Sequence, residues 1–150
     1  MAQETPTPSN PIQRVEVTAG SELVDQYGHV NYKNYLKLFE PGQDDYMNRR
    51  GIGFAQVEET MGLRSIVRAI NIEFLGQFFA DETAIVETSV GKIGTTSYGL
   101  HQTMLKEGQP ISKMDMTIVL MDANDQKTPI PDQLKAKLLE PYDGELETAK

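Results

Sequence analysis

The sequence predicts an α+β fold, in which an antiparallel sheet of five or six strands wraps around one long helix. Two observations support this. One stretch near the start carries apolar residues at helical spacing, and most of the chain beyond residue 63 alternates with a period of two between short turns. A single long helix can cover only one face of such a sheet, so we expect the sheet to curve around it.

The predicted helix opens near Asn31, a residue type favoured at helix N-caps. Its apolar face follows the i, i+3, i+4, i+7 spacing, with Tyr32, Tyr35, Leu36 and Phe39. Pro41 removes one backbone hydrogen bond, yet the apolar phase continues at Tyr46 and Met47. We therefore predict one kinked helix that ends between residues 48 and 51.

The strands are predicted from alternation and from the turn residues between them. We expect them at residues 12–18, from 63 to the mid-seventies, and at 83–93, 95–105 and 111–121. A hairpin loop is expected at 106–110, and Pro131 suits the first turn of a closing helix that ends near 139. Residues 54–61 are ambiguous, and a short strand before a turn at Gly62 is the expectation.

Alternation also assigns faces to the strand that begins near residue 63. Ile66, Ile70, Ile72 and Phe74 are expected on one face. The opposite face of the sheet would carry Val67, Ala69, Val119 and Met121. A second apolar face is most simply covered by another subunit, so we expect a homo-oligomer.

Length and composition indicate one globular domain. A chain of 150 residues buries roughly 70% of its unfolded surface. We divide it into a disordered N-terminal arm at 1–11, the domain at 12–139 and an acidic tail at 140–150.

Charge and residue types exclude several function classes. The net charge of −8 disfavours nucleic acid, which requires a basic surface. No apolar run is long enough to span a bilayer, and the start has neither the basic nor the apolar segment of a secretion signal, so no membrane partner and a cytoplasmic location are expected. There are no cysteines, and the two histidines lack metal-ligand spacing, so neither a metal nor a cofactor is expected.

The main functional hypothesis comes from the polar segment that precedes the helix. Asp25 and His29 lie a few residues before a helix N-terminus, where free backbone N–H groups favour an anion or a developing oxyanion. A general base beside an oxyanion site is what hydrolysis of an activated acyl group requires. The segment therefore predicts an acyl hydrolase.

The Asp25-x-x-Gly28-His29-Val30-Asn31 segment, together with the order of elements, resembles the hotdog-fold thioesterases of the 4-hydroxybenzoyl-CoA thioesterase class. The resemblance covers residues 12 to about 135. It implies that Asp25 is nucleophile or general base, that Gly28 permits close approach of the thioester, and that an N–H near Tyr32 binds the carbonyl oxygen. It also implies edge-to-edge homodimers, often paired into homotetramers, with acyl pockets at the subunit interface.

Two further matches bear on the substrate. Asp25, His29, Val30 and Asn31 match a pattern of the plant acyl-ACP thioesterases, in which Tyr27 would be Asn. Class members carry a Ser-aromatic pair after basic residues on a middle strand. Here Ser97 is followed by Tyr98 but preceded by Thr95 and Thr96, so the resemblance makes 95–97 candidates for binding pantetheine or phosphate, with Asn31 as a further contact.

Each candidate also has a structural interpretation. Asp25 and Gly28 suit an ordinary turn, Asn31 an N-cap, and His29 can orient the loop instead of contacting the substrate. Glu40, Asp44 and Asp45 are rival bases on the helix. The candidate phosphate contacts, each better explained on its own as a solvated surface charge, are Arg49, Arg50, Arg64, Arg68 and Lys92.

We therefore expect an acyl-CoA thioesterase. The alternatives are an acyl-ACP thioesterase, a non-catalytic acyl-thioester-binding protein, and a hotdog hydratase or dehydratase, which would need a His-centred site.

Overall fold

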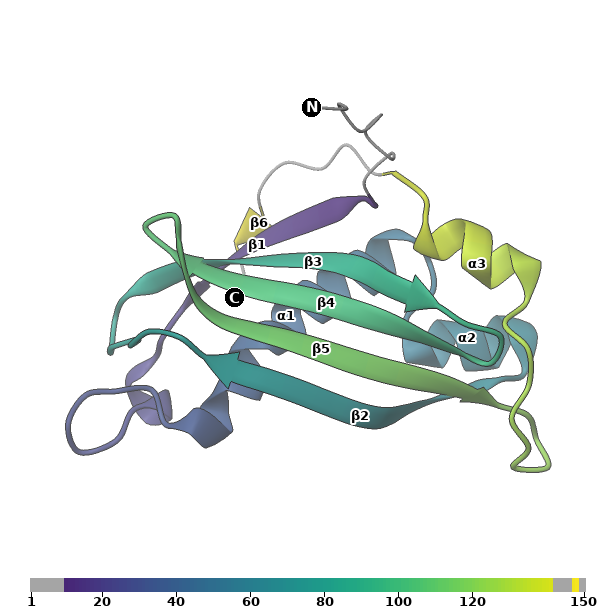
Figure 1. Ribbon diagram of the computed structural model, residues 1–150, viewed down its shortest axis with the longest axis horizontal. Helices are drawn as coiled ribbons and strands as arrows, with labels where there is room; N and C mark the ends of the chain where they lie inside the picture. The colour runs from purple at the N-terminus through teal and green to yellow at the C-terminus, as the bar shows by residue number, and fades with distance from the viewer. Residues whose placement is uncertain (1–9, 142–146, 149–150) are drawn as a thin grey trace, which may run out of the picture.

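The computed structural model describes residues 10–141 and 147–148 (Figure 1). In this part of the chain, six strands form one sheet in the order β2-β5-β4-β3-β1-β6, antiparallel except for β6 on β1. The elements are β1 (Ile12–Thr18), η1 (Ser21–Leu23), η2 (Tyr32–Asn34), α1 (Tyr35–Arg49), α2 (Phe54–Met61), β2 (Arg64–Phe74), β3 (Thr83–Ile93), β4 (Ser97–Lys106), β5 (Gln109–Met121), α3 (Asp132–Leu138) and β6 (Glu147–Thr148).

The predicted α+β architecture is confirmed: the sheet wraps around one long helix, the arrangement called the hotdog fold (Figure 1). Most of the predicted arm and tail, at residues 1–9, 142–146 and 149–150, lies outside the described residues.

Helix α1 begins and ends close to where the apolar spacing predicts. Its first turn is the 3₁₀ segment η2, where Asn31 is the N-cap and its Oδ1 accepts a hydrogen bond from the Lys33 amide at 3.0 Å. The helix continues through Pro41 to Arg49 and buries Phe39 and Tyr46 completely against the sheet.

Gly42 lets α1 lie unusually close to the sheet. A Cβ at this position would be 2.8 Å from both the Thr88 Oγ1 and the Val86 Cγ1 of β3, so only glycine fits without displacement. The buried amide of Gln102 occupies the same contact, and its Nε2 donates to the Phe39 carbonyl and to Thr88 Oγ1, each at 2.9 Å. These bonds satisfy polar groups that are out of reach of water.

The faces of β2 differ from the sequence prediction because the strand contains a bulge. The pairing with β5 shifts register between Val67 and Ala69. Val67 is consequently opposite Ile118 on the inner face, while Ile66 is opposite Val119 on the outer face, so both were predicted on the wrong side. Period-two reasoning fails wherever one extra residue is inserted.

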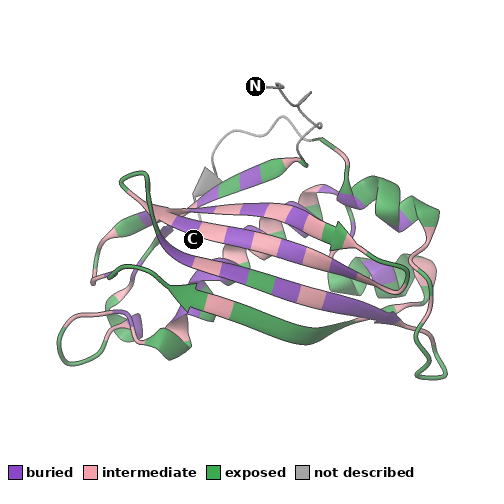
Figure 2. Ribbon diagram, viewed as in Figure 1, coloured by how far each residue is buried: buried purple, intermediate pink, exposed green. Residues whose placement is uncertain are grey.

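Strand β2 is an edge strand with an exposed surface, whereas β3, β4 and β5 alternate between buried and half-buried residues (Figure 2). Its inner-face residues Val67, Ile70 and Phe74 remain 40–46% exposed. Apolar side chains on an unpaired edge are a surface that another chain can cover.

Residues 54–61 form helix α2, and the predicted strand is wrong. The Gly53 amide donates to Gln56 Oε1 at 2.8 Å, which closes the first turn, and Val57 is completely buried. Helix α2 has one apolar face but only two turns. Its apolar residues are therefore too few for a helical period to be recognised in the sequence. The turn expected at Gly62 is confirmed, with a left-handed φ of 69° that ends the helix.

Helix α3 is fastened to α1 by a buried polar network. Tyr46 OH donates to the Leu138 carbonyl at 2.6 Å, and the guanidinium of Arg50 donates to the carbonyls of Tyr46 and Glu140 and to Gln13 Oε1. Burial lowers the pKa of Arg50, which is only 3% exposed. Arg50 is thus a structural residue, which corrects its place among the phosphate-contact candidates.

Replacing Tyr46 with Phe should leave the Leu138 carbonyl without a partner in a buried site. We expect the free energy of unfolding to fall by about 1–3 kcal/mol, measured by urea denaturation. Tyr27→Phe is the matched control, because Tyr27 is 75% exposed, and it should change stability by less than about 0.5 kcal/mol. Equal effects of the two substitutions would contradict the importance of this bond.

Candidate active site

Asp25 organises a tight turn with its backbone and with one carboxylate oxygen. Its Oδ1 accepts hydrogen bonds from the amides of Tyr27 (2.9 Å) and His29 (3.1 Å), and its own amide donates to the His29 carbonyl at 2.7 Å. Gly28 has φ of 80°, a conformation that favours glycine. The turn thus satisfies the structural interpretation of Asp25, while Oδ2 makes no hydrogen bond to any described residue.

A second turn in the chain repeats this geometry. Asp122 Oδ1 accepts from the amides of Asn124 and Gln126, its amide donates to the Gln126 carbonyl, and Asp125 has φ of 59° at the position of Gly28. The turn is therefore a folding motif that carries no chemistry by itself. What distinguishes Asp25 must lie in its surroundings.

The segment that follows Asp25 ends at an unused backbone amide at the start of the helix. Among the first amides of the helical segment, that of Lys33 donates to Asn31 Oδ1 and that of Asn34 to the Asn31 carbonyl. The amide of Tyr32 has no partner within the described residues. It is the helix-start donor that the resemblance implies, and it can bind a partial negative charge.

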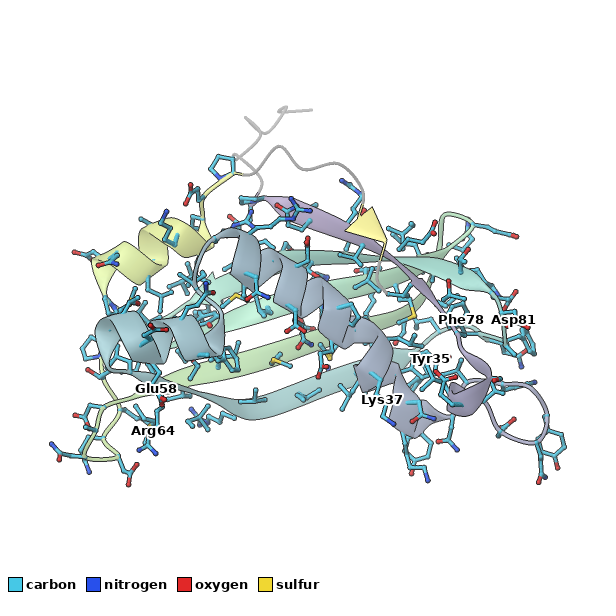
Figure 3. The ribbon with its side chains drawn as sticks, turned by 180° about the vertical axis from the view of Figure 1, so that it is seen from behind. Tyr35, Lys37, Glu58, Arg64, Phe78 and Asp81 are labelled. Carbon is cyan, nitrogen blue, oxygen red and sulfur yellow. The ribbon has the colours of Figure 1, made fainter. Side chains whose placement is uncertain are left out.

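The segment around His29 is held against the β2–β3 connection. The Val30 amide donates to the Phe78 carbonyl at 2.8 Å, and the imidazole of His29 packs edge-on against Phe79, with ring centroids 4.6 Å apart. No hydrogen bond engages either ring nitrogen within the described residues. Figure 3 shows Phe78 and Tyr35 at one end of the molecule and Arg64 at the other.

Phe78 and Phe79 were not among the sequence candidates. Phe79 contacts His29, which is fifty residues away in the sequence, and local sequence patterns cannot predict such a contact.

The predicted substrate-binding residues Thr95, Thr96 and Ser97 lie at the opposite end of the sheet. The Asp25 turn is near Phe78 and the last residue of β4, Lys106, which donates to the Gln77 carbonyl at 2.8 Å. Ser97 begins the same strand, so about 30 Å of strand separates the two groups. Within one chain, the structure does not bring these two groups together.

The Asp25 carboxylate itself is exposed in the single chain. The rival carboxylates on α1 have other surroundings: Asp45 is paired with Arg49 at 2.8 Å, while Glu40 and Asp44 are exposed along the helix. None of the three is next to an unpartnered helix-start amide.

Helices α1 and α2 enclose a cavity of about 270 Å³ over the middle of the sheet. Its buried floor is Met47, Leu100 and Met116, and Gln43 forms part of its wall. The rim consists of the exposed residues Asp44, Asn48, Phe54, Ala55 and Gln56. The sequence pattern gave no indication of this cavity, because residues 54–61 were expected to form a strand.

The described residues contain neither a group of three or more metal-binding side chains nor a helix of the length and apolarity that crossing a membrane requires.

The model of one protein family, the Thioesterase-like superfamily, matches residues 20–138, which include the Asp25 turn, α1, the cavity and most of the sheet. The chain belongs to the thioesterase-like superfamily. Membership supports thioester hydrolysis as the general class of reaction. No curated protein sequence matches the chain.

Solved structures with thioesterase names share the fold. A 1,4-dihydroxy-2-naphthoyl-CoA thioesterase from Synechocystis has a TM-score of 0.77 at 10% identity, over 85% of this chain and 95% of that one. A DHNA-CoA thioesterase from Staphylococcus aureus has a TM-score of 0.73 at 21% identity, over 83% and 87%. A putative oleoyl thioesterase from Lactobacillus plantarum has 0.80 at 12%, over 94% of this chain and 53% of that one.

Gly28 and Gly108 form a matched pair that separates backbone strain from function. Both have positive φ (80° and 77°), and an added Cβ would meet nothing within 4 Å at either site. Gly28→Ala and Gly108→Ala should each lower the free energy of unfolding by about 1 kcal/mol. Only Gly28→Ala should lower thioester hydrolysis, tenfold or more, in a thiol-release assay, because it displaces the Asp25 turn. If Gly28→Ala and Gly108→Ala were equally active, the Asp25 turn would not be part of the active site.

Proposed function

We propose that the protein hydrolyses an acyl-CoA, with Asp25 as nucleophile or general base and the Tyr32 amide as oxyanion donor. One observation carries the proposal: a carboxylate with one free oxygen and an unpartnered amide lie at the two ends of the same short segment. The twin turn at Asp122 does not lead directly into a helix, because residues 127–131 separate it from α3, which begins at Asp132. The superfamily match adds the reaction class.

The proposed chemistry uses each group for one task. Asp25 either removes a proton from the attacking water or adds to the thioester carbon to form an anhydride that water then opens. In both cases the carbonyl oxygen becomes negative and is stabilised by the Tyr32 amide, the C–S bond breaks, and coenzyme A leaves as the thiol. Following ¹⁸O from water into Asp25 during a single turnover separates the two routes.

We further propose that the site is completed in a homodimer formed through the β2 edges. The exposed inner-face residues of β2 and the exposed carboxylate support this, since both would be covered by a second copy. Around a two-fold axis the strands run antiparallel, so the end of one sheet that carries Thr95–Ser97 points toward the Asp25 end of the other. This arrangement can unite the two groups that one chain keeps apart.

An acyl-carrier-protein thioester remains the alternative substrate, and a binding protein or a hydratase the alternative functions. His29 gives no support to a hydratase, because it contacts a phenyl ring and has no acidic partner among the described residues. CoA and acyl-carrier-protein thioesters of the same acyl group, compared in one assay, decide the carrier.

Asp25→Asn should retain the fold, because an amide oxygen can still accept both turn hydrogen bonds, while removing the base. We expect kcat for acyl-CoA hydrolysis to fall by about 10²–10⁴, measured as thiol release. Asp122→Asn alters the twin turn in the same way and should retain kcat within twofold.

Near-normal turnover of Asp25→Asn would remove Asp25 from the mechanism. Tight acyl-CoA binding by the wild type without thiol release would instead establish the non-catalytic alternative.

Sedimentation equilibrium at micromolar concentration should give a mass of two chains or four. The expectation follows from the free apolar edge of β2, which a monomer would leave in water. A monomer that is fully active at the same concentration would contradict a shared site.

A further inference from the structure

The same helical segment that begins at the proposed oxyanion donor, Tyr32, carries Gln43 and Met47 in the lining of the cavity between α1 and α2. Tyr35 packs edge-on against Phe74 at 5.0 Å, which places the start of the helix over the end of β2. Four residues back along β2 is Ile70, whose cross-strand partner is Met116 on the cavity floor. The distance along the strand is therefore ~13 Å.

Each of the two elements that meet at this contact carries an exposed apolar side chain further along, Leu36 on α1 and Ile70 on β2. Leu36 lies on the same flank of α1 as Gln43 and Met47, seven and eleven residues further along, and is 41% exposed. Ile70 is 42% exposed on the inner face of β2, where it is paired with Met116. An extended alkyl chain advances only ~1.3 Å per C–C bond because its bonds zigzag, so about ten bonds span this distance.

A chain of hydrogen bonds determines which atoms Gln43 can offer to the cavity. The Phe39 carbonyl can only accept, so the Gln102 amide must present its Nε2 to that carbonyl and its Oε1 toward Gln43. Gln43 must then donate through its own Nε2, at 2.9 Å. Its Oε1 is left as an acceptor beside the apolar floor of Met47, Leu100 and Met116, while the other polar residues of the lining are on the exposed rim.

This acceptor has consequences for what enters the cavity. In the free protein water can reach the half-buried amide of Gln43. A plain hydrocarbon would displace that water and leave Oε1 without a partner, whereas a hydroxyl group would replace the lost hydrogen bond.

We propose that this cavity holds the distal part of an aliphatic acyl chain of about ten carbons, and that Gln43 selects chains that carry a hydroxyl group there. The position of the thioester end rests on the proposed function. The cavity then selects which acyl group binds, and Asp25 acts on the thioester.

Binding of non-hydrolysable thioethers tests the proposal without any turnover. The ligands are S-butyl-CoA, S-decyl-CoA and S-(10-hydroxydecyl)-CoA, with affinities measured by isothermal titration calorimetry. The hydroxylated ligand should bind the wild type about fivefold or more tightly than S-decyl-CoA. S-butyl-CoA is too short to reach the cavity, so it reports whether each variant is folded.

Two variants and one control localise the effect. Ala55→Trp fills the exposed rim and should weaken both ten-carbon ligands about tenfold, with S-butyl-CoA unchanged. Ala136→Trp places the same side chain on the exposed surface of α3 and should change nothing. Gln43→Leu should abolish or reverse the preference for the hydroxylated ligand.

The cavity would not be the acyl site if the ten-carbon ligands bound no more tightly than S-butyl-CoA. The same conclusion would follow if Ala55→Trp left their affinities unchanged. A preference that survives Gln43→Leu would overturn the role of Gln43. Failure of the proposed function is a separate result: the thioethers would follow the expected pattern while the corresponding thioesters release no thiol.

Discussion

The structure depends on how closely helix α1 can approach the sheet. At Gly42 there is no room for a Cβ against Thr88 and Val86, and beside it the Gln102 amide bonds the Phe39 carbonyl in the space between helix and strands. These contacts set the height of α1 over β3 and β4. The position of the helix start, and therefore of the Tyr32 amide, follows from that height, as does the orientation of Gln43 in the cavity wall.

The active-site hypothesis rests on context more than on motif. Asp25 and Asp122 make the same turn with the same hydrogen bonds, so neither the aspartate nor its geometry identifies a catalytic group. The difference is that the Asp25 turn leads directly into a helix with a free amide. A negative charge that develops beside this amide is stabilised. The Asp122 turn is instead separated from the start of α3 by residues 127–131, and the cation beside it, Arg64, is paired with Asp125.

The single chain leaves both its polar and its apolar groups incompletely covered. The inner face of β2 is about half exposed, the Asp25 carboxylate faces solvent, and Thr95–Ser97 lie a strand's length from it. One second copy on the β2 edge would account for all three. Edge strands with apolar side chains are costly to leave in water, and the proposed pairing would remove that cost.

Local pattern in the sequence was enough to determine the long helix with its Asn31 cap, the strands of the curved sheet and the Asp25–Asn31 segment, because hydrophobic period, capping and turn chemistry act between near neighbours. It could not determine the faces of β2, where a bulge moves Val67 to the inner side, nor helix α2, whose two turns are too short for a clear period. The contact of His29 with Phe79, the structural role of Arg50 and the cavity floor at Leu100 and Met116 were decided only by tertiary structure. Each joins residues that are far apart in the chain, and local spacing carries no information about which distant side chains packing will bring together.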